Sequence, residues 1–242
     1  MYHSMYIGNK NTWDDYSLVP VNKIYISEPS QKTNIVEVEG ASGSLDLSNY
    51  ITGYPVYSNR SGNASFYLLD AIDARALSNS GYAFPANYTF YDIFDQLRGD
   101  LDGKTFKCWL EDDPDWFYEG RINVATAMGK PRPAIALAYD FSPYKRKRNP
   151  LKFTLNGASP IITRKVLTKE EVGTAPSEIT FTVTGNAAQI TIQCAALNEY
   201  DTRLFQPGTY TLYEWVVYGE TSFLVSAATG TSVSFEMSPG RV

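Results

Sequence analysis

Short runs of apolar and aromatic residues recur along this chain, and some of them alternate with polar residues in the period-two pattern of half-buried β-strands. The alternation is clearest at residues 34–39. Residues 106–111 and 116–124 have the aromatic and apolar residues that are typical of strands, and another apolar run follows at 134–141. The sequence Asp-Asp-Pro-Asp at residues 112–115 has strong turn-forming residues between two of these runs. The pattern therefore predicts a β-hairpin whose strands are aromatic-rich, followed by a further strand.

One segment of the first half has the spacing of an α-helix instead. Apolar residues fall at the i, i+3, i+4 and i+7 positions of residues 90–97. Thr89 is a candidate N-cap with Asp92 as its capping acid, and Gly99 is predicted to end the helix. Residues 70–86 show little pattern and are expected to form a loop. The first half is therefore predicted to be mostly β with one short helix, an α+β arrangement.

From Pro150 onward the chain changes to short strands at intervals of roughly ten residues, a rhythm typical of a β-sandwich. Thr184, Gly185 and Asn186 are predicted to form a hairpin turn inside this region. The chain has 242 residues, which suits two domains. We expect the domains to comprise residues 1–149 and 150–242.

Composition narrows the choice of partners. The net charge is −5, so binding to nucleic acid through bulk charge is not expected. The basic run at residues 145–148 is interpreted as a solvated linker, with phosphate contact as the alternative. The first ten residues lack the pattern of a signal peptide, and no apolar stretch reaches 18 residues. We expect a soluble chain that is not exported by the usual signal, with no specific nucleic-acid partner and no membrane partner.

The two cysteines, Cys108 and Cys194, fall one in each half of the chain. This placement does not suit a disulfide within a domain, and it predicts two buried free thiols in a protein folded in a reducing compartment.

Residues that support catalysis are scarce. His3 is the sole histidine, which removes histidine triads and multi-histidine zinc sites. No glycine-rich phosphate-binding loop is present. The acidic residues 111–119 are interpreted as a solvated hairpin tip, with calcium binding as the alternative. We therefore expect no enzymatic activity, no cofactor and no metal.

Aromatic residues near the C-terminus could form a binding surface. In a regular strand Tyr213 and Trp215 share one face. They are candidates for a face that stacks on a glycan or contacts a partner, and packing in the core is the alternative.

Residues 1–148 resemble the N-terminal domain of distal tail proteins (Dit) of phages with long, non-contractile tails. The resemblance is carried by blocks that occur in the family's order. They are Ile7, Asn-Thr-Trp-Asp-Asp at 11–15, Leu-Val-Pro at 18–20, Gly-Ser-Leu-Asp-Leu at 43–47, Thr-Gly-Tyr-Pro-Val at 52–56 with Asn-Arg at 59–60, Leu-Glu-Asp-Asp-Pro at 110–114, Tyr118, Gly-Arg at 120–121, and the closing segment 139–144. Residues 150–242 resemble the family's galectin-like sandwich in strand rhythm and length.

This resemblance implies a virion structural protein, assembled in the host cytoplasm and located at the tail tip. The first domain would form a hexameric ring joining the tail tube to the baseplate or host-adsorption apparatus. The sandwich would hold receptor-binding or other baseplate proteins. The candidate ring contacts are Asn11, Trp13, Asp14, Phe106, Trp109 and Tyr139. The alternative function is a carbohydrate-binding module that recognises host or surface glycans.

Overall fold

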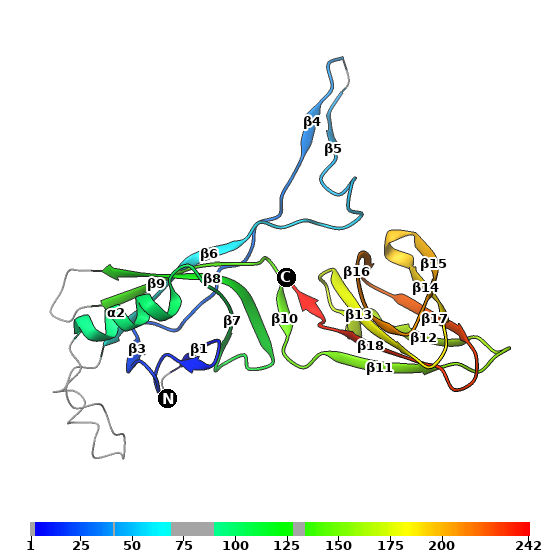
Figure 1. Ribbon diagram of the computed structural model, residues 1–242. Coiled ribbons are helices and arrows are strands. Elements are labelled where there is room, and N and C mark those ends of the chain that lie inside the picture. The colour runs from blue at the N-terminus through cyan, green and yellow to red at the C-terminus, as the bar shows by residue number, and fades with distance from the viewer. Residues whose placement is uncertain (1–2, 41, 69–89, 128–133) are drawn as a thin grey trace. The chain divides into compact units, whose positions relative to one another are not determined.

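The computed structural model describes residues 3–40, 42–68, 90–127 and 134–242 (Figure 1). In these residues the chain is mostly β-strand, with two α-helices and one short 3₁₀ helix. The predicted fold class, mostly β with a sandwich toward the C-terminus, is confirmed.

The described residues group into two compact units. The first unit contains residues 1–30 and 57–143, and the second contains residues 31–56 and 144–242. Residues 31–56, which interrupt the first unit in sequence, therefore group with the second. The predicted domains, residues 1–149 and 150–242, stay a prediction.

The first unit is built on one antiparallel sheet with the strand order β2-β1-β7-β8-β9-β6-β3. Its strands are β1 (Met5–Ile7), β2 (Lys10–Asn11), β3 (Leu18–Pro20), β6 (Arg60–Leu68), β7 (Thr105–Leu110), β8 (Trp116–Ala127) and β9 (Ala134–Phe141). The predicted hairpin is confirmed, because β7 pairs with β8 and Cys108 lies opposite Tyr118.

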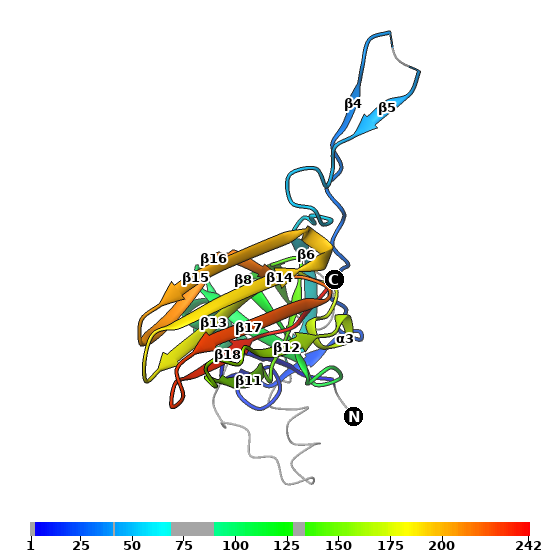
Figure 2. The same ribbon diagram turned by 90° about the vertical axis from the view of Figure 1, so that its right-hand side faces the viewer.

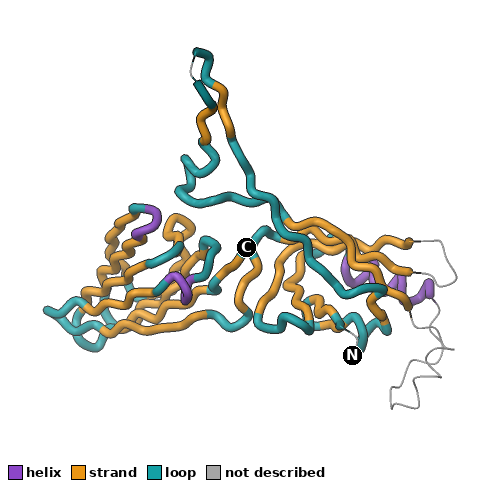
Figure 3. The backbone as a smooth tube through the Cα atoms, turned by 180° about the vertical axis from the view of Figure 1, so that it is seen from behind, coloured by secondary structure: helices purple, strands orange, loops and turns teal. Residues whose placement is uncertain are grey.

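Alternation in β9 explains how this sheet obtains a buried face. Ile135, Leu137, Tyr139 and Phe141 are buried, whereas the intervening residues point to the opposite face. Helix α2 (Phe90–Leu101) lies against β8 and covers the buried face (Figures 1 and 3).

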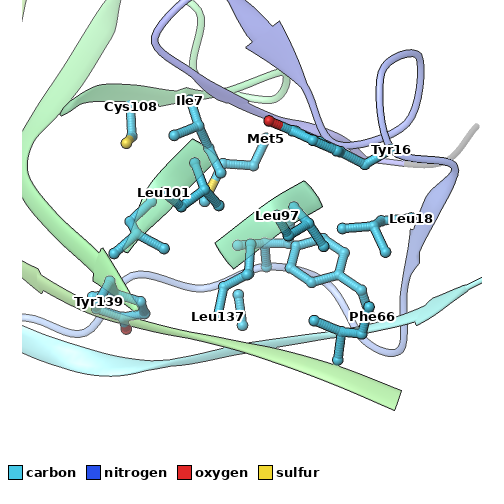
Figure 4. Packing of buried hydrophobic residues seen from close by; sticks show 14 of the residues in the cluster. Met5, Ile7, Tyr16, Leu18, Phe66, Leu97, Leu101, Cys108, Leu137 and Tyr139 are labelled. Atoms are coloured by element: carbon cyan, nitrogen blue, oxygen red, sulfur yellow. The ribbon is translucent and has the colours of Figure 1, made fainter. Parts of the chain in front are cut away.

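Helix α2 contributes residues one turn apart to the same core. Ile93, Leu97 and Leu101 are all buried. Figure 4 shows Leu97 and Leu101 among Met5, Ile7, Phe66 and Leu137, which come from strands on several parts of the sheet. The helix extends past the predicted end at Gly99, and the left-handed residue that follows it is Gly103, with φ of 76°. The predicted N-cap Thr89 and the predicted loop at residues 70–86 lie outside the described residues.

The second unit contains a sandwich of two four-stranded antiparallel sheets (Figure 2). The first sheet has the order β11-β18-β13-β16, and the second has the order β12-β17-β14-β15. The strands are β11 (Leu151–Asn156), β12 (Thr163–Leu167), β13 (Ser177–Thr184), β14 (Ala188–Cys194), β15 (Glu199–Phe205), β16 (Gly208–Val217), β17 (Thr221–Ala227) and β18 (Ser232–Met237).

The prediction of a hairpin at residues 184–186 is wrong. Strand β13 pairs with β16 and β18, whereas β14 pairs with β15 and β17. The turn therefore crosses from one sheet to the other. A turn signal between two alternating strands does not distinguish these cases, because both strands bury one face in the same core.

A short helix in the second unit was not predicted. Helix α3 (Lys169–Val172) follows Thr168, whose side chain accepts a hydrogen bond from the Glu171 amide while the Glu171 carboxylate accepts one from the Thr168 amide. The Thr-x-x-Glu sequence at 168–171 is a capping-box pattern, so the signal was present in the sequence. A 3₁₀ turn follows β14 at Ala195–Leu197.

The remaining strands lie outside the sandwich. Strand β10 (Lys145–Lys147) pairs with β19 (Gly240–Arg241) in the second unit. Strands β4 (Ile35–Glu37) and β5 (Ser44–Asp46) pair only with each other in the part of the chain that the structure describes. We call residues 31–56, which contain this ribbon, the arm.

Candidate assembly surfaces

Asn11 shapes the loop that was predicted to be a ring contact. Its Oδ1 accepts hydrogen bonds from the amides of Trp13 at 2.7 Å and Asp14 at 3.3 Å, and its Nδ2 donates to the Ser4 hydroxyl at 3.0 Å. Asn11 is only 5% exposed and is therefore unavailable as a contact surface. In the same loop Asp14 is exposed and Trp13 is half-buried, so these two remain candidates.

The aromatic residues of β7 are partly committed within the chain. The Trp109 ring stacks on the Tyr6 ring of β1, with centroids 5.1 Å apart. Phe106 is half-buried and packs against the core of the first unit. Each retains some exposed surface, and each also joins β7 to the rest of its own unit.

Tyr139 is buried and does not present a surface to a partner. It is 5% exposed, and its hydroxyl accepts a hydrogen bond from the Ser27 amide at 3.1 Å and donates one to the Tyr25 carbonyl at 3.3 Å. The proposed ring contact at Tyr139 is therefore corrected. Strand β9 is paired on both edges, so it can meet another copy only through its outward residues. These are Ala134, Ala136, Ala138 and Asp140.

The acidic turn after β7 holds the N-terminal segment. Glu111 accepts hydrogen bonds from the Ser4 amide at 3.0 Å and the Ser4 hydroxyl at 3.1 Å. Asp112 pairs with His3 and lies 3.5 Å from the Lys23 ammonium. Glu111 and Asp112 therefore bind residues of the N-terminal segment and do not only contact solvent. Among the described residues no group of three histidine, cysteine or acidic side chains is arranged to hold a metal ion.

The basic run at residues 145–148 is not a plain linker. Its first three residues form β10, and the Arg146 guanidinium donates to the Pro176 carbonyl at 2.7 Å and to the Ser177 hydroxyl at 2.8 Å. Lys147 and Arg148 are exposed. Arg146 thus attaches this segment to the start of β13.

Both cysteines are free and buried, as predicted. Burial raises the pKa of the Cys108 thiol to about 12, so the thiol is protonated at neutral pH. The Cys194 thiol donates a hydrogen bond to the Tyr218 carbonyl at 3.0 Å.

Tyr213 and Trp215 do not share a face, which corrects the predicted stacking surface. Tyr213 is 74% exposed, whereas Trp215 is 2% exposed. The pairing of β13 with β16 jumps from Val216 to Leu212, so the residues between them form a bulge. A bulge breaks the period of two and turns neighbouring side chains to different sides.

The buried Trp215 closes one side of the sandwich. Its ring packs against Phe181 and Phe205, and its Nε1 donates to Asp201 of β15 at 2.8 Å. The hydrogen bond from Trp215 is the main reason that the pKa of Asp201 lies below its usual value. Trp215 therefore joins the two sheets at the side where β15 and β16 are the edge strands.

Arg203 extends this connection to the surface. Its guanidinium lies 2.8 Å from Asp201 and 2.6 Å from Glu214 of the bulge. The hydrogen bond from Arg203 lowers the pKa of Glu214. The three side chains are about half exposed, so these ion pairs contribute little to stability.

The arm carries an apolar surface that no described residue covers. In the β4–β5 ribbon Val36 lies opposite Leu45, and Val38 falls on the same face by alternation. These three side chains are 39%, 52% and 49% exposed. We call them the apolar face of the arm. Ile35 and Asp46 lie on the opposite face.

The base of the arm is better anchored than its tip. The Tyr54 ring lies 5.3 Å from the Tyr218 ring, and the Pro55 carbonyl accepts a hydrogen bond from the Tyr144 hydroxyl at 3.3 Å. The Lys32 amide donates to the Val56 carbonyl at 2.8 Å, which brings the two ends of the arm together. The alternation at residues 34–39 predicted a strand where β4 lies, but its pairing with β5 was not predicted, although the glycines at 40 and 43 were a signal for a hairpin.

None of the helices in the described ranges is long and apolar enough to cross a membrane.

No family model matches the sequence, and no curated protein matches it. A solved structure does match in fold: the Dit protein of phage SPP1 (gp19.1), described as a paradigm of the hub adsorption apparatus in phages that infect Gram-positive bacteria. The match has a TM-score of 0.61 and covers 98% of each chain, with 10% sequence identity. The resemblance to distal tail proteins is therefore confirmed at the level of the fold, and this chain has the fold of SPP1 Dit.

Proposed function

We propose that this chain is a structural subunit of a phage tail tip. It would form a hexameric ring that joins the tail tube to the baseplate or host-adsorption apparatus, with the sandwich as the attachment point for receptor-binding proteins. The observation that carries the proposal is the fold match over 98% of both chains to a protein described as an adsorption hub. The proposal includes a location in the virion after assembly in the host cytoplasm, a galectin-like sandwich and no enzymatic role.

The arm supports the assembly part of this proposal. A two-stranded ribbon is marginally stable in water by itself, and this one exposes its apolar face. Association with another copy would remove those side chains from water. A ring needs a heterologous contact, in which one patch meets a different patch on the next copy, and a protruding ribbon suits such a contact.

The candidate ring contacts that remain at the surface are Trp13, Asp14, Phe106 and Trp109, which are exposed or half-buried. All four lie in the loop after β2 or on β7, within the first unit. In the proposal they contact the neighbouring copy, whereas Asn11 and Tyr139 act inside their own chain.

The alternative function, a carbohydrate-binding module, loses its main support. A sugar-stacking platform needs an accessible aromatic ring, and Trp215 is 2% exposed. Tyr213 is exposed, but it lies alone on the bulge among the candidate residues.

The test is the mass and shape of the purified chain. Sedimentation analysis and electron microscopy should give a ring with a central hole. The double variant Val36→Ser, Leu45→Ser removes most of the arm's apolar face and should reduce the ring population strongly. The matched control Ile161→Ser, Ile162→Ser changes two side chains that are 67% and 56% exposed but lie off the arm, and it should leave the ring intact. A wild-type chain that stays monomeric at all concentrations would contradict the proposal.

A further inference from the structure

The edge strand β15 has a sequence that is complementary to itself in the antiparallel direction. Its residues read Tyr-Asp-Thr-Arg-Leu at 200–204. With Thr202 at the centre, Tyr200 and Leu204 lie at equal distances on either side of it, and so do Asp201 and Arg203. We infer that β15 pairs with β15 of a second copy about a two-fold axis at Thr202, joining two sandwiches through one continuous sheet.

The position of β15 in its sheet permits this pairing. Strand β15 pairs with β14 along its full length, from Glu199 opposite Cys194 to Phe205 opposite Ala188. No described strand pairs with its other side. An edge strand has backbone donors and acceptors directed away from its sheet, and these are available to a further strand.

The outward side chains of β15 include two large apolar residues that are mostly exposed. Tyr200 is 71% exposed and Leu204 is 67% exposed, and alternation places both on the outer face of the sheet together with Thr202. In the proposed pair Tyr200 lies opposite Leu204 of the second copy, and this contact occurs twice by symmetry. Directly opposed side chains have Cβ atoms about 5 Å apart, close enough for the ring and the aliphatic chain to pack.

The charges are complementary in the same register. Asp201 lies opposite Arg203 of the second copy, and Arg203 lies opposite its Asp201. Within one chain Arg203 already lies 2.8 Å from Asp201 and 2.6 Å from Glu214, so each guanidinium would join a small network of opposite charge. Such an isologous contact, in which the same patch meets itself, is the form that a two-fold axis requires.

The other edge strands do not offer an equivalent register. Two-fold pairing of β12 about its centre would set Lys165 against Lys165 of the second copy, which is unfavourable. Strand β11 has Lys152 as its charged residue and therefore no opposite charge to match it. Strand β16 is interrupted by the bulge at residues 213–215. The complementary register is thus particular to β15 among the sandwich edges.

This contact is independent of ring formation. The ring contacts proposed above lie in the first unit and the arm, whereas β15 belongs to the sandwich. A single strand pair buries little area, so we expect weak, concentration-dependent pairing of the isolated chain.

A cysteine at the two-fold axis tests the register in the full chain. Opposed residues of an antiparallel pair have Cα atoms roughly 4.5 to 5.5 Å apart, within the range of a disulfide. The variant Thr202→Cys should form a disulfide-linked dimer under mild oxidation, visible on a non-reducing denaturing gel. Cys108 and Cys194 are buried and should not contribute.

Thr154→Cys is the matched control. Thr154 lies on the edge strand β11, and its hydroxyl lies 3.0 Å from that of Ser234, much as the Thr202 hydroxyl lies 2.9 Å from that of Thr191. The control should remain a single chain on the gel. Absence of the Thr202→Cys dimer, or equal cross-linking of the two variants, would overturn the proposal.

A complementary pair of charge variants provides the second test. Tyr200→Lys alone and Leu204→Glu alone should each weaken dimerisation about tenfold or more, because the apolar pair is lost at both symmetric positions. A mixture of the two single variants should form a heterodimer, since the new lysine meets the new glutamate at one position and the native apolar pair remains at the other. Sedimentation of the two variants alone and mixed measures this. If the mixture associates no better than either variant alone, the proposed register is wrong.

Discussion

The arm and the sandwich are both β-structure, but they differ in where their apolar side chains go. In the sandwich Phe181 and Phe235 are each 1% exposed because two sheets cover them. In the arm Val36 and Leu45 are 39% and 52% exposed because no described element covers the two-stranded ribbon. The sandwich therefore gains its stability from within the chain. The apolar face of the arm contributes only when another surface covers it.

This difference can be tested by free energies of unfolding. The largest effect is expected in the sandwich core, where Phe181 contacts Phe205, Tyr210, Trp215 and Phe235. The variant Phe181→Ala should lower the free energy of unfolding by about 3–5 kcal/mol, because the small side chain leaves a cavity between the sheets. Urea denaturation monitored by tryptophan fluorescence measures this. Phe181→Leu, which retains most of the volume, should cost much less, and equal losses for the two variants would contradict a packing origin.

A smaller effect is expected where the two sheets are joined by a hydrogen bond. Asp201→Asn weakens the contact with the Trp215 N–H and should lower the free energy of unfolding by about 1 kcal/mol at pH 7. The pKa of Asp201 is below its ordinary value of 3.8 in the folded chain. The stabilisation is therefore complete above that value and is lost as the pH falls through the lower folded pKa.

The same variant thus has a pH signature. The stability difference between wild type and Asp201→Asn should begin to shrink near pH 3.8, where the unfolded chain starts to bind a proton at Asp201, and should be lost once the pH is below the lower pKa of the folded chain. Denaturation curves of both proteins at pH 7 and at low pH provide the comparison. A difference that stays constant with pH would show that the charge on Asp201 does not stabilise the fold.

The smallest effect is expected in the arm. Leu45→Ala should change the free energy of unfolding by less than about 0.5 kcal/mol, because its side chain is already 52% exposed in the single chain. The measurement must use a concentration at which the chain is monomeric. A loss comparable with that of Phe181→Ala would mean that the arm is covered by its own chain.

The sequence predicted the features that depend on local periodicity. The β7–β8 hairpin and the face of α2 formed by Ile93 and Leu97 follow from residue spacing and nearby turn residues. The sandwich class followed from strand rhythm. These properties depend on interactions within a short window of sequence, and such interactions can be read without knowing the topology.

The candidate surfaces were less predictable because they depend on long-range pairing. Tyr139 was expected at a surface, but β6 and β8 flank its strand and its hydroxyl bonds to Ser27. Trp215 was expected beside Tyr213, but the bulge turns it into the core. An aromatic residue in a strand gives the same local signal whether it is inside or outside, and only the neighbouring strands decide between them.

The way the arm leaves the first unit has a practical consequence. Ser30 and Ser58 lie at the two points where the chain departs and returns, and the Ser58 amide donates to the Ser30 carbonyl at 2.9 Å while their hydroxyls are 2.6 Å apart. Hydrogen bonds between Ser30 and Ser58 therefore hold the two ends of the arm close together where it begins. A foreign peptide, an epitope tag or a shortened loop could replace the arm between these two serines. Its two ends would already be close together, as at the end of a hairpin, so the insertion should disturb the first unit little.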